Sequence, residues 1–240
     1  MVNQIFIRTF AHTTDIYNIT FMNKIIVFAN QKGGVGKSTL CMLFANYLKW
    51  KKQEVCIIDT DLQQTISQMR NSDLDFFKLD EAPYSIQPFP VKGIEVMEKL
   101  MNNAAKYDGI VLIDAPGNLT QNGLIPLLSR SDFVVCPFRY DKATTSSTVT
   151  FVKAFRKIEK ETPGMHSQLL FLPNNINRKG NLEEKKVWKQ NVDTFNMIGT
   201  VLPMIPTRAA LERVDTIQLN PAQRDVLSAP FEEIINIINK

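Results

Sequence analysis

Two lysines lie five residues apart in a glycine-rich segment near the beginning of the chain. Residues 31–39 read Gln-Lys-Gly-Gly-Val-Gly-Lys-Ser-Thr, so these lysines are Lys32 and Lys37. A phosphate-binding loop has a glycine, four free positions and then Gly-Lys-Ser/Thr. Residues 36–38 match the end of this pattern, whereas Gln31 stands where the first glycine is expected. The additional lysine indicates a phosphate contact beyond those that one chain's own loop requires.

The segments on either side would fold this loop into an anion cradle. The apolar run 25–29 predicts a strand before the loop, and the helical spacing of apolar residues from Lys37 to Leu48 predicts a helix after it. Glycines allow left-handed dihedrals that turn successive N–H groups inward, and the helix N-terminus adds its dipole. The alternative is a glycine-rich turn that binds nothing, and the order strand, loop, helix favours the phosphate loop.

The phosphate-loop pattern assigns roles to individual residues. Lys37 would reach the β- and γ-phosphates, the Ser38 hydroxyl would coordinate Mg²⁺, and Thr39 would lie near the α-phosphate. The backbone N–H groups that surround the phosphates would come from Gly33, Gly34, Val35 and Gly36.

Two aspartates follow the next apolar run. Residues 55–58 predict a buried strand, and Asp59 and Asp61 come directly after it. In a doubly wound sheet, ligands bind at the carboxyl ends of the strands. The two carboxylates flank one residue on an extended segment, and we expect them to point in opposite directions. One aspartate would then support the loop and the metal shell, and the other would face the γ-phosphate. The alternative is a pair of solvated aspartates that cap the next helix.

A third aspartate follows another apolar run. Residues 110–113 predict a buried parallel strand that presents Asp114 at the same edge of the sheet. Mg²⁺ prefers a few oxygen ligands and retains water molecules. We therefore expect Ser38 and Asp114, the latter through water, to hold Mg²⁺, with Asp59 in the metal shell. Pro116 and Gly117 would form a flexible exit that senses the γ-phosphate.

Length and patterning predict one large α/β domain. The chain has 240 residues, 44% of them hydrophobic, which is enough for a full core. Strand-like and helix-like segments alternate, which predicts a three-layer, doubly wound, mostly parallel sheet with helices on both faces. Further strands are expected at 132–137, 168–173 and 199–202. Further helices are expected at 93–104, 118–129, 144–161, 182–192, 207–213 and 230–239, and residues 71–92 are the least regular region.

The remaining composition limits the possible classes of protein. The net charge of +4 permits contact with nucleic acid without requiring it. The three cysteines, Cys41, Cys56 and Cys136, lie in apolar segments without a Cys-x-x-Cys pair, which indicates reduced core residues rather than a metal or cluster site. No apolar stretch reaches the roughly 20 residues that span a bilayer.

The two ends of the chain need separate interpretations. Residues 1–21 lack the features of a signal peptide, so we expect an extension upstream of a start at Met22, or else an additional strand or arm, before a single domain at 22–240. The last helix, 230–239, is amphipathic and could anchor the chain to a membrane. Its polar face carries Glu232 and Glu233, which anionic lipid would repel, so we expect it to pack on the core.

The order of these lysines and aspartates resembles the ParA/MinD family of deviant-Walker P-loop ATPases. The chain is most similar to the small ParA-type proteins that segregate plasmids and chromosomes. The resemblance covers about residues 22–240 and rests on the segment Lys-Gly-Gly-Val-Gly-Lys-Ser-Thr and on Asp-Thr-Asp-Leu-Gln, which is similar to the family's Asp-x-Asp-Pro-Gln.

The resemblance implies a P-loop NTPase fold and roles for several residues. Lys32 would cross a dimer interface to the partner's nucleotide, so that ATP lies between two subunits. Asp61 would position or activate the attacking water, and Asp59 would support the loop and the metal. The residues implied near the adenine are Asn175 or Asn177, and Pro206.

The sequence departs from the family pattern at two positions and in its length before the first strand. Leu62 replaces the proline after Asp61, and Gly117 replaces the second proline after Asp114, which puts the geometry of the water-positioning loop in question. Only 21 residues precede the first strand region, so an N-terminal helix-turn-helix domain and sequence-specific operator binding are not expected.

Basic residues cluster in the second half of the chain. Clustered lysines and arginines bind phosphate backbones without sequence preference, although such clusters are also ordinary solvated surface. The resemblance favours DNA binding by the ATP-bound dimer. The candidate residues are Lys153, Arg156, Lys157, Arg178, Lys179, Lys185, Lys186 and Arg208.

The resemblance therefore implies a switch ATPase that segregates or positions a plasmid, chromosome or mobile element. ATP and Mg²⁺ would close a homodimer, the dimer would bind DNA nonspecifically, and a ParB-like or other cargo-bound activator would stimulate slow hydrolysis. The expected location is the cytoplasm, on the nucleoid, without stable membrane association. The alternatives are a MinD-like membrane-associated positioning ATPase, and a ligase or iron–sulfur reductase on the same fold.

Overall fold

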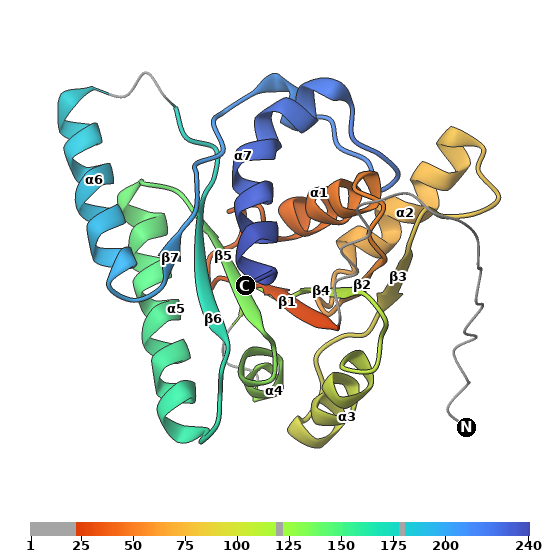
Figure 1. Cartoon of the computed structure of the whole chain (residues 1–240), viewed down its shortest axis with the longest axis horizontal. Helices are drawn as coiled ribbons and strands as arrows, with labels where there is room; N and C mark the ends of the chain where they lie inside the picture. The colour runs from red at the N-terminus through yellow and green to blue at the C-terminus, as the bar shows by residue number, and fades with distance from the viewer. Residues whose placement is uncertain (1–22, 119–121, 178–180) are drawn as a thin grey trace.

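A parallel β-sheet forms the centre of the molecule (Figure 1). The structure is a computed structural model and describes residues 23–118, 122–177 and 181–240. The N-terminal extension, Arg178 and Lys179 therefore lie outside the described residues. The strands are β1 (Lys24–Phe28), β2 (Val55–Asp59), β3 (Ser85–Pro88), β4 (Ile110–Asp114), β5 (Phe133–Phe138), β6 (Gln168–Pro173) and β7 (Thr200–Val201).

The sheet is doubly wound, as the sequence predicts. Within the described chain the strand order is β3-β2-β4-β1-β5-β6-β7, and every neighbouring pair is parallel. The strand β1 lies between β4 and β5, so the chain turns to one side of β1 in its first half and to the other side in its second half. This reversal makes the carboxyl end of β1 the point where an open α/β sheet binds ligands.

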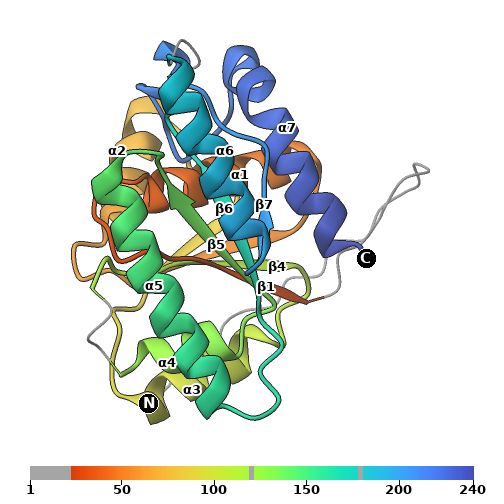
Figure 2. The same ribbon diagram turned by 90° about the vertical axis from the view of Figure 1, so that its left-hand side faces the viewer.

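Helices cover both faces of the sheet. One apolar cluster joins the sheet to α1, α2 and α7, and the other joins it to α3, α4, α5 and α6. Figure 1 shows α3 and α4 across the sheet from α1 and α7, and Figure 2 shows α5 and α6 next to each other. The helices are α1 (Lys37–Trp50), α2 (Thr65–Phe77), α3 (Ile94–Ala104), α4 (Leu124–Ser129), α5 (Lys142–Glu161), α6 (Leu182–Asn196), the short 3-10 helix η1 (Ala209–Leu211) and α7 (Pro221–Ile238).

Residues 71–92, predicted as the least regular region, contain the end of one helix and a complete strand. The helix α2 extends to Phe77, and β3 pairs with β2 at the edge of the sheet. Only Ile66 and Arg70 of α2 are buried, and β3 is largely exposed, so neither element shows the apolar periodicity that sequence patterns depend on.

Three predicted helices have different bounds. The segment 207–213 contains only η1, and within 118–129 the helix begins at Leu124, with residues 119–121 outside the described part of the chain. The last helix begins at Pro221, well before 230, because Asn220 and Gln223 form a capping box at its start. It then continues through Pro230, which lies buried inside it.

The helix α7 packs on the core, as expected. Phe231, Ile234, Ile235 and Ile238 all belong to the cluster that joins α7 to the sheet. The ring of Phe231 makes an edge contact with Phe44 of α1, with 4.9 Å between the ring centroids. These apolar side chains are therefore buried against other parts of the same chain. In the described chain, no helix is both long enough and apolar enough to cross a membrane.

Candidate functional site

The loop between β1 and α1 has the backbone of a phosphate cradle. Gly34 and Gly36 take left-handed φ values of 74° and 97°, and α1 begins at Lys37, directly after Gly36. The entry to the loop is fixed by Asn30, whose buried side chain donates to the Pro137 carbonyl at 2.8 Å and to the Thr148 hydroxyl at 3.0 Å. The first N–H groups of α1 thus lie at the mouth of a preformed loop.

The two lysines of the loop occupy opposite environments. Lys37 is 8% exposed, and its ammonium donates to the Lys32 carbonyl at 3.2 Å. Burial lowers the pKa of Lys37, and the negative charges of Asp114 and Asp61 oppose that effect. Lys32 is exposed to solvent. One lysine therefore belongs to the interior of the site and the other to its surface.

Asp59 and Asp114 lie side by side at the carboxyl ends of β2 and β4. They are partners in the parallel register of these strands, and both are buried. One oxygen of Asp59 accepts hydrogen bonds from the backbone N–H and the hydroxyl of Ser67, each at 3.1 Å. The other oxygen of Asp59 and both oxygens of Asp114 are buried without a hydrogen-bond partner in the described part of the chain.

These unpaired oxygens fit a hard cation. The pKa of Asp114 is raised to about 7, chiefly by burial and also by the Asp59 carboxylate, while the Ser38 hydroxyl and the Lys37 ammonium oppose the rise. A divalent cation would replace the missing partners and favour the charged form. The described residues contain no group of three or more His, Cys, Asp or Glu side chains placed to hold a metal. Mg²⁺ would therefore depend on Ser38, a few carboxylates, water and phosphate oxygens.

Asp61 differs from the expectation that placed it on an extended segment with Asp59. The strand β2 ends at Asp59, and Asp61 lies in the turn that follows, where its carboxylate accepts from the Gln63 N–H at 2.9 Å. The direction of the Asp61 side chain is therefore not set by the alternation of side chains along a strand. Its charge acts on both Lys37 and Asp114, so it belongs to the same site. The carboxylate of Asp59 contacts α2, whereas that of Asp61 contacts the turn after β2. The two aspartates therefore have distinct environments.

The two departures from the family pattern have different surroundings. A Cβ atom placed on Gly117 would lie 3.4 Å from the Lys37 ammonium and 3.9 Å from the Gln31 carbonyl oxygen. The backbone after β4 thus approaches the phosphate loop closely. Leu62 is 72% exposed, next to Asp61.

A cavity of about 340 Å³ adjoins the loop. Gly34, Gly36 and Thr39 line one side, and residues after β6 and β7 line the other, among them Asn175 and Pro206. The side chain of Asn175 accepts from the Thr207 hydroxyl at 2.7 Å. The two segments are also joined by the β-bridge between Ile176 and Pro206. The structure thus places Asn175 and Pro206 beside the loop.

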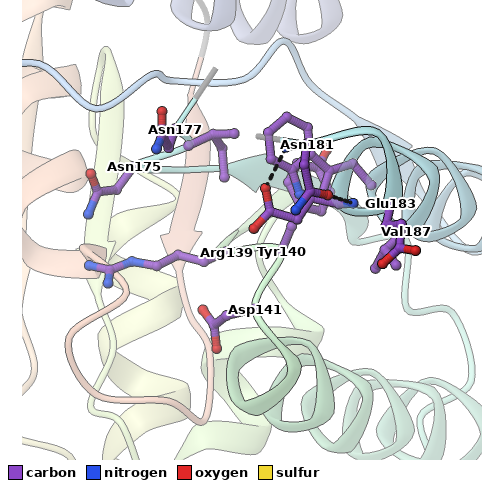
Figure 3. Close-up of a pocket in the computed structure, with 11 residues that line it drawn as sticks. Arg139, Tyr140, Asp141, Asn175, Asn177, Asn181, Glu183 and Val187 are labelled. Carbon is purple, nitrogen blue, oxygen red and sulfur yellow. Dashed lines mark hydrogen bonds between the residues drawn. The ribbon is translucent and has the colours of Figure 1, made fainter. Parts of the chain in front are cut away.

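Asn177 lines a different cavity, of about 520 Å³ (Figure 3). This second cavity lies between the end of β5 and the start of α6, and the stacked rings of Tyr140 and Trp188 form part of its wall. Arg139 and Asn175 line both cavities. Of the two asparagines proposed near the adenine, only Asn175 lines the cavity beside the loop.

Sequence reasoning missed two residues that contact the loop. Asn174, at the end of β6, donates to the Val35 carbonyl at 2.9 Å, and Arg139, after β5, donates to the Gly34 carbonyl at 3.1 Å. Both follow strands that were predicted, so their positions at the carboxyl edge of the sheet were the available signal.

The candidate DNA-binding residues do not form one group. On α5, Arg156 and Lys157 pair with Glu159 and Glu161 of the same helix, at 2.6 and 3.9 Å. Lys153 of α5 and the α6 residues Lys185 and Lys186 are exposed. Arg208 lies on another segment, after β7, and lines the cavity beside the phosphate loop.

Comparison with known proteins agrees with this geometry. The family model described as "CobQ/CobB/MinD/ParA nucleotide binding domain" matches residues 26–229. An uncharacterized protein from Pseudomonas putida is 27% identical in an alignment of 146 residues that covers 53% of this chain and 53% of that protein. The chain thus spans about half the length of the curated relatives it matches.

Two solved structures have a similar fold. A plasmid partition protein from Borrelia burgdorferi has a TM-score of 0.66 at 18% identity, over 90% of this chain and 99% of that one. An ATP complex of McdA from Cyanothece has a TM-score of 0.70 at 15% identity, over 90% of this chain and 96% of that one. The family model covers most of the chain, including the loop, the aspartates and the cavity beside them. The chain therefore belongs to the CobQ/CobB/MinD/ParA family of nucleotide-binding domains.

Proposed function

We propose that this chain is an ATPase that binds Mg²⁺ and ATP at the loop 31–39. The observation that carries this proposal is the set of buried carboxylate oxygens of Asp59 and Asp114, which have no hydrogen-bond partner among the described residues, beside the buried side chain of Lys37. Such charges are costly to bury unless a ligand compensates them. A triphosphate with its cation supplies both a negative partner for Lys37 and a positive partner for the carboxylates.

The proposed chemistry is hydrolysis of the terminal phosphate of ATP. The loop N–H groups and Lys37 would hold the phosphates, and Asp61 would orient the attacking water. Mg²⁺, held through Ser38 and Asp114, would neutralise the developing charge. Phosphoryl transfer is largely positioning and charge stabilisation, so hydrolysis would remain slow until a partner protein orders the water-positioning turn after Asp61.

We further propose that ATP closes a homodimer. Lys32 supports this step because it is exposed, whereas Lys37 already supplies the loop's own site with a buried ammonium. An exposed cation on the loop can reach the phosphates of a second copy. The dimer would bind DNA without sequence preference, and a ParB-like or other cargo-bound activator would stimulate it. Together these steps would segregate or position a plasmid, chromosome or mobile element from the cytoplasm.

Light scattering coupled to size exclusion tests the dimer, and phosphate release tests the ATPase. We expect the wild-type chain to dimerise with ATP and to stay monomeric with ADP. Asp61→Ala should accumulate as an ATP-bound dimer, and Lys32→Ala should bind ATP yet fail to hydrolyse it. Lys99→Ala, an exposed change on α3, is the control that should match the wild type. Normal hydrolysis by Asp61→Ala would refute the role of that residue, and a wild-type chain that binds no nucleotide would refute the proposal itself.

The MinD-like alternative is less well supported. Its membrane contact would need an available amphipathic helix, and the apolar side of α7 packs in the core through Phe231 and Ile234. Sedimentation with anionic vesicles in ATP separates the two functions. We expect the chain to remain in the supernatant, and nucleotide-dependent pelleting with vesicles would instead favour the membrane-associated function.

A further inference from the structure

Three carbonyl groups of the phosphate loop point toward side chains that donate to them. The carbonyl of Lys32 accepts from the Lys37 ammonium, that of Gly34 from the Arg139 guanidinium, and that of Val35 from the Asn174 amide. Lys37 belongs to the loop motif itself. Arg139 and Asn174 come from the ends of β5 and β6, more than 100 positions further along the chain.

These contacts determine where the loop N–H groups point. A trans peptide group is planar, so the carbonyl of one residue and the N–H of the next point in opposite directions. Arg139 holds the Gly34 carbonyl toward the end of β5, so the Val35 N–H is directed to the opposite side of the loop, where we infer that the phosphates bind. In the same way, a donor on the Val35 carbonyl directs the Gly36 N–H inward. Inward N–H groups are what a phosphate requires.

The surroundings of the two side chains support a dedicated contact. Asn174 lies so close to Gly36 that a Cβ atom there would be 2.6 Å from its amide nitrogen, at a left-handed φ of 97°. The Arg139 Nε is buried without a hydrogen-bond partner in the described residues, so Arg139 is not held by a full set of contacts of its own. Figure 3 shows its guanidinium extending toward Asn175, away from Glu183 and Val187 on α6.

We propose that Arg139 and Asn174 form a carbonyl clamp that holds the phosphate loop open for nucleotide before any nucleotide arrives. Both are positioning residues, because they act through the loop backbone. This inference depends on the proposed nucleotide-binding function and adds two residues that support the same site. It makes the affinity for the phosphates depend on two strands, β5 and β6, that lie outside the loop motif.

The test is calorimetric titration with MgADP and with the non-hydrolysable analogue MgAMPPNP. We expect Arg139→Ala and Asn174→Ala each to weaken the binding of both nucleotides about 10-fold. Each variant removes one hydrogen bond that orients the N–H groups of the phosphate loop. In the double variant the affinity should fall by less than the product of the two single-variant factors. Removing either hydrogen bond already releases the same loop. Arg139→Lys keeps a donor and should recover most of the affinity.

Two controls separate the clamp from a general loss of stability. Arg130→Ala and Asn102→Ala remove an arginine and an asparagine that contact each other on the surface, through a hydrogen bond of 2.8 Å, and should leave nucleotide affinity unchanged. Urea unfolding without nucleotide should give nearly the same midpoint for the clamp variants and the wild type. A purely structural role would instead move the midpoint and spare the affinity of the folded fraction.

Each remaining outcome decides between explanations. Wild-type affinity in both alanine variants would overturn the clamp while the proposed function stands. A loss confined to MgAMPPNP in Arg139→Ala would assign Arg139 to direct contact with the γ-phosphate and would also overturn the clamp. If the wild-type chain bound neither nucleotide, the proposed function and the clamp would both fail.

Discussion

Both carboxylate oxygens of Asp114 are buried in the described chain without a hydrogen bond of good geometry, although the Ser38 hydroxyl is near enough to lower the pKa of this group. The pKa of this group rises from its ordinary value of 3.8 to about 7, chiefly through burial. The folded chain therefore holds a proton here that the unfolded chain releases between about pH 4 and pH 7. The free energy of unfolding should fall as the pH rises through this window, because the folded state then binds more protons than the unfolded state.

We expect Asp114→Asn to stabilise the nucleotide-free chain at pH 8 by a few kcal/mol, because a neutral amide of the same shape replaces a buried charge. The variant should also lose the part of the pH dependence between pH 4 and 7 that belongs to this group. Urea unfolding at pH 5 and pH 8 measures both effects. Asp193→Asn, on the exposed side of α6, should change stability by less than about 0.5 kcal/mol. A variant less stable than the wild type at pH 8 would contradict this account of Asp114.

At the scale of elements, a buried arginine joins three segments that are distant in the sequence. Arg70 of α2 donates to the Tyr84 carbonyl before β3 at 2.6 Å, and to the hydroxyl and carbonyl of Thr216 before α7 at 2.9 and 2.8 Å. Asp73 of α2 accepts from the N–H and hydroxyl of Thr216, each at 2.7 Å. Since Asp59 also contacts α2 through Ser67, this helix connects the nucleotide edge with the loop that precedes α7.

We expect Arg70→Ala to reduce the free energy of unfolding by about 3 kcal/mol, because it leaves buried carbonyl groups without donors. Arg70→Lys should recover only part of this loss, because an ammonium lacks the fork that reaches both partners. Hydrogen exchange should speed up in residues 65–77 and 215–220 ahead of β1 and β4. Arg130→Ala removes a half-exposed ion pair with Glu98 and should lower stability by less than about 1 kcal/mol. Equal losses of stability for the two alanine variants would mean that the buried hydrogen bonds of Arg70 contribute no more than an exposed ion pair.

The same elements explain what the sequence could and could not predict. The central strands and α1 were predictable because buried segments such as 110–113 and 133–138 are continuous apolar runs. The strand β3 was not, because an edge strand with one neighbour needs no apolar face. The last helix was predicted only from residue 230, whereas α7 begins at Pro221 and runs through Pro230, and the Phe231 ring that follows packs against Phe44 and Tyr47.

The residues of the site likewise divide into those that the sequence could predict and those that it could not. Lys37, Ser38 and the aspartates could be found because a local motif or the end of an apolar strand marks each of them. Asn174 and Arg139 could not, since only the folded sheet brings the ends of β5 and β6 against the carbonyls of Gly34 and Val35. Contacts between distant segments leave no periodic signal in the sequence.

At the scale of the whole molecule, the exposed lysines at the start of α6 lie on the nucleotide edge. The helix α6 begins at Leu182, beyond the carboxyl end of β6, and carries Lys185 and Lys186 in its first turns. The basic residues of α5 are partly compensated by Glu159 and Glu161. A switch in which nucleotide controls DNA binding would therefore depend more on α6 than on α5.

Fluorescence anisotropy with a labelled duplex can measure this difference. We expect Lys185→Ala with Lys186→Ala to weaken ATP-dependent DNA binding regardless of sequence. The slope of log affinity against log salt should fall by about 4, roughly one unit for each DNA phosphate that the two lysines of each of the two copies no longer neutralise. Lys99→Ala on α3 should leave both quantities unchanged. The effect should appear with ATP and vanish with ADP, because only the closed dimer would align the lysines of two copies along one duplex. A salt slope that stays the same in the double variant, or equal binding in ATP and ADP, would show that these lysines are solvated surface and that DNA is not what the nucleotide controls.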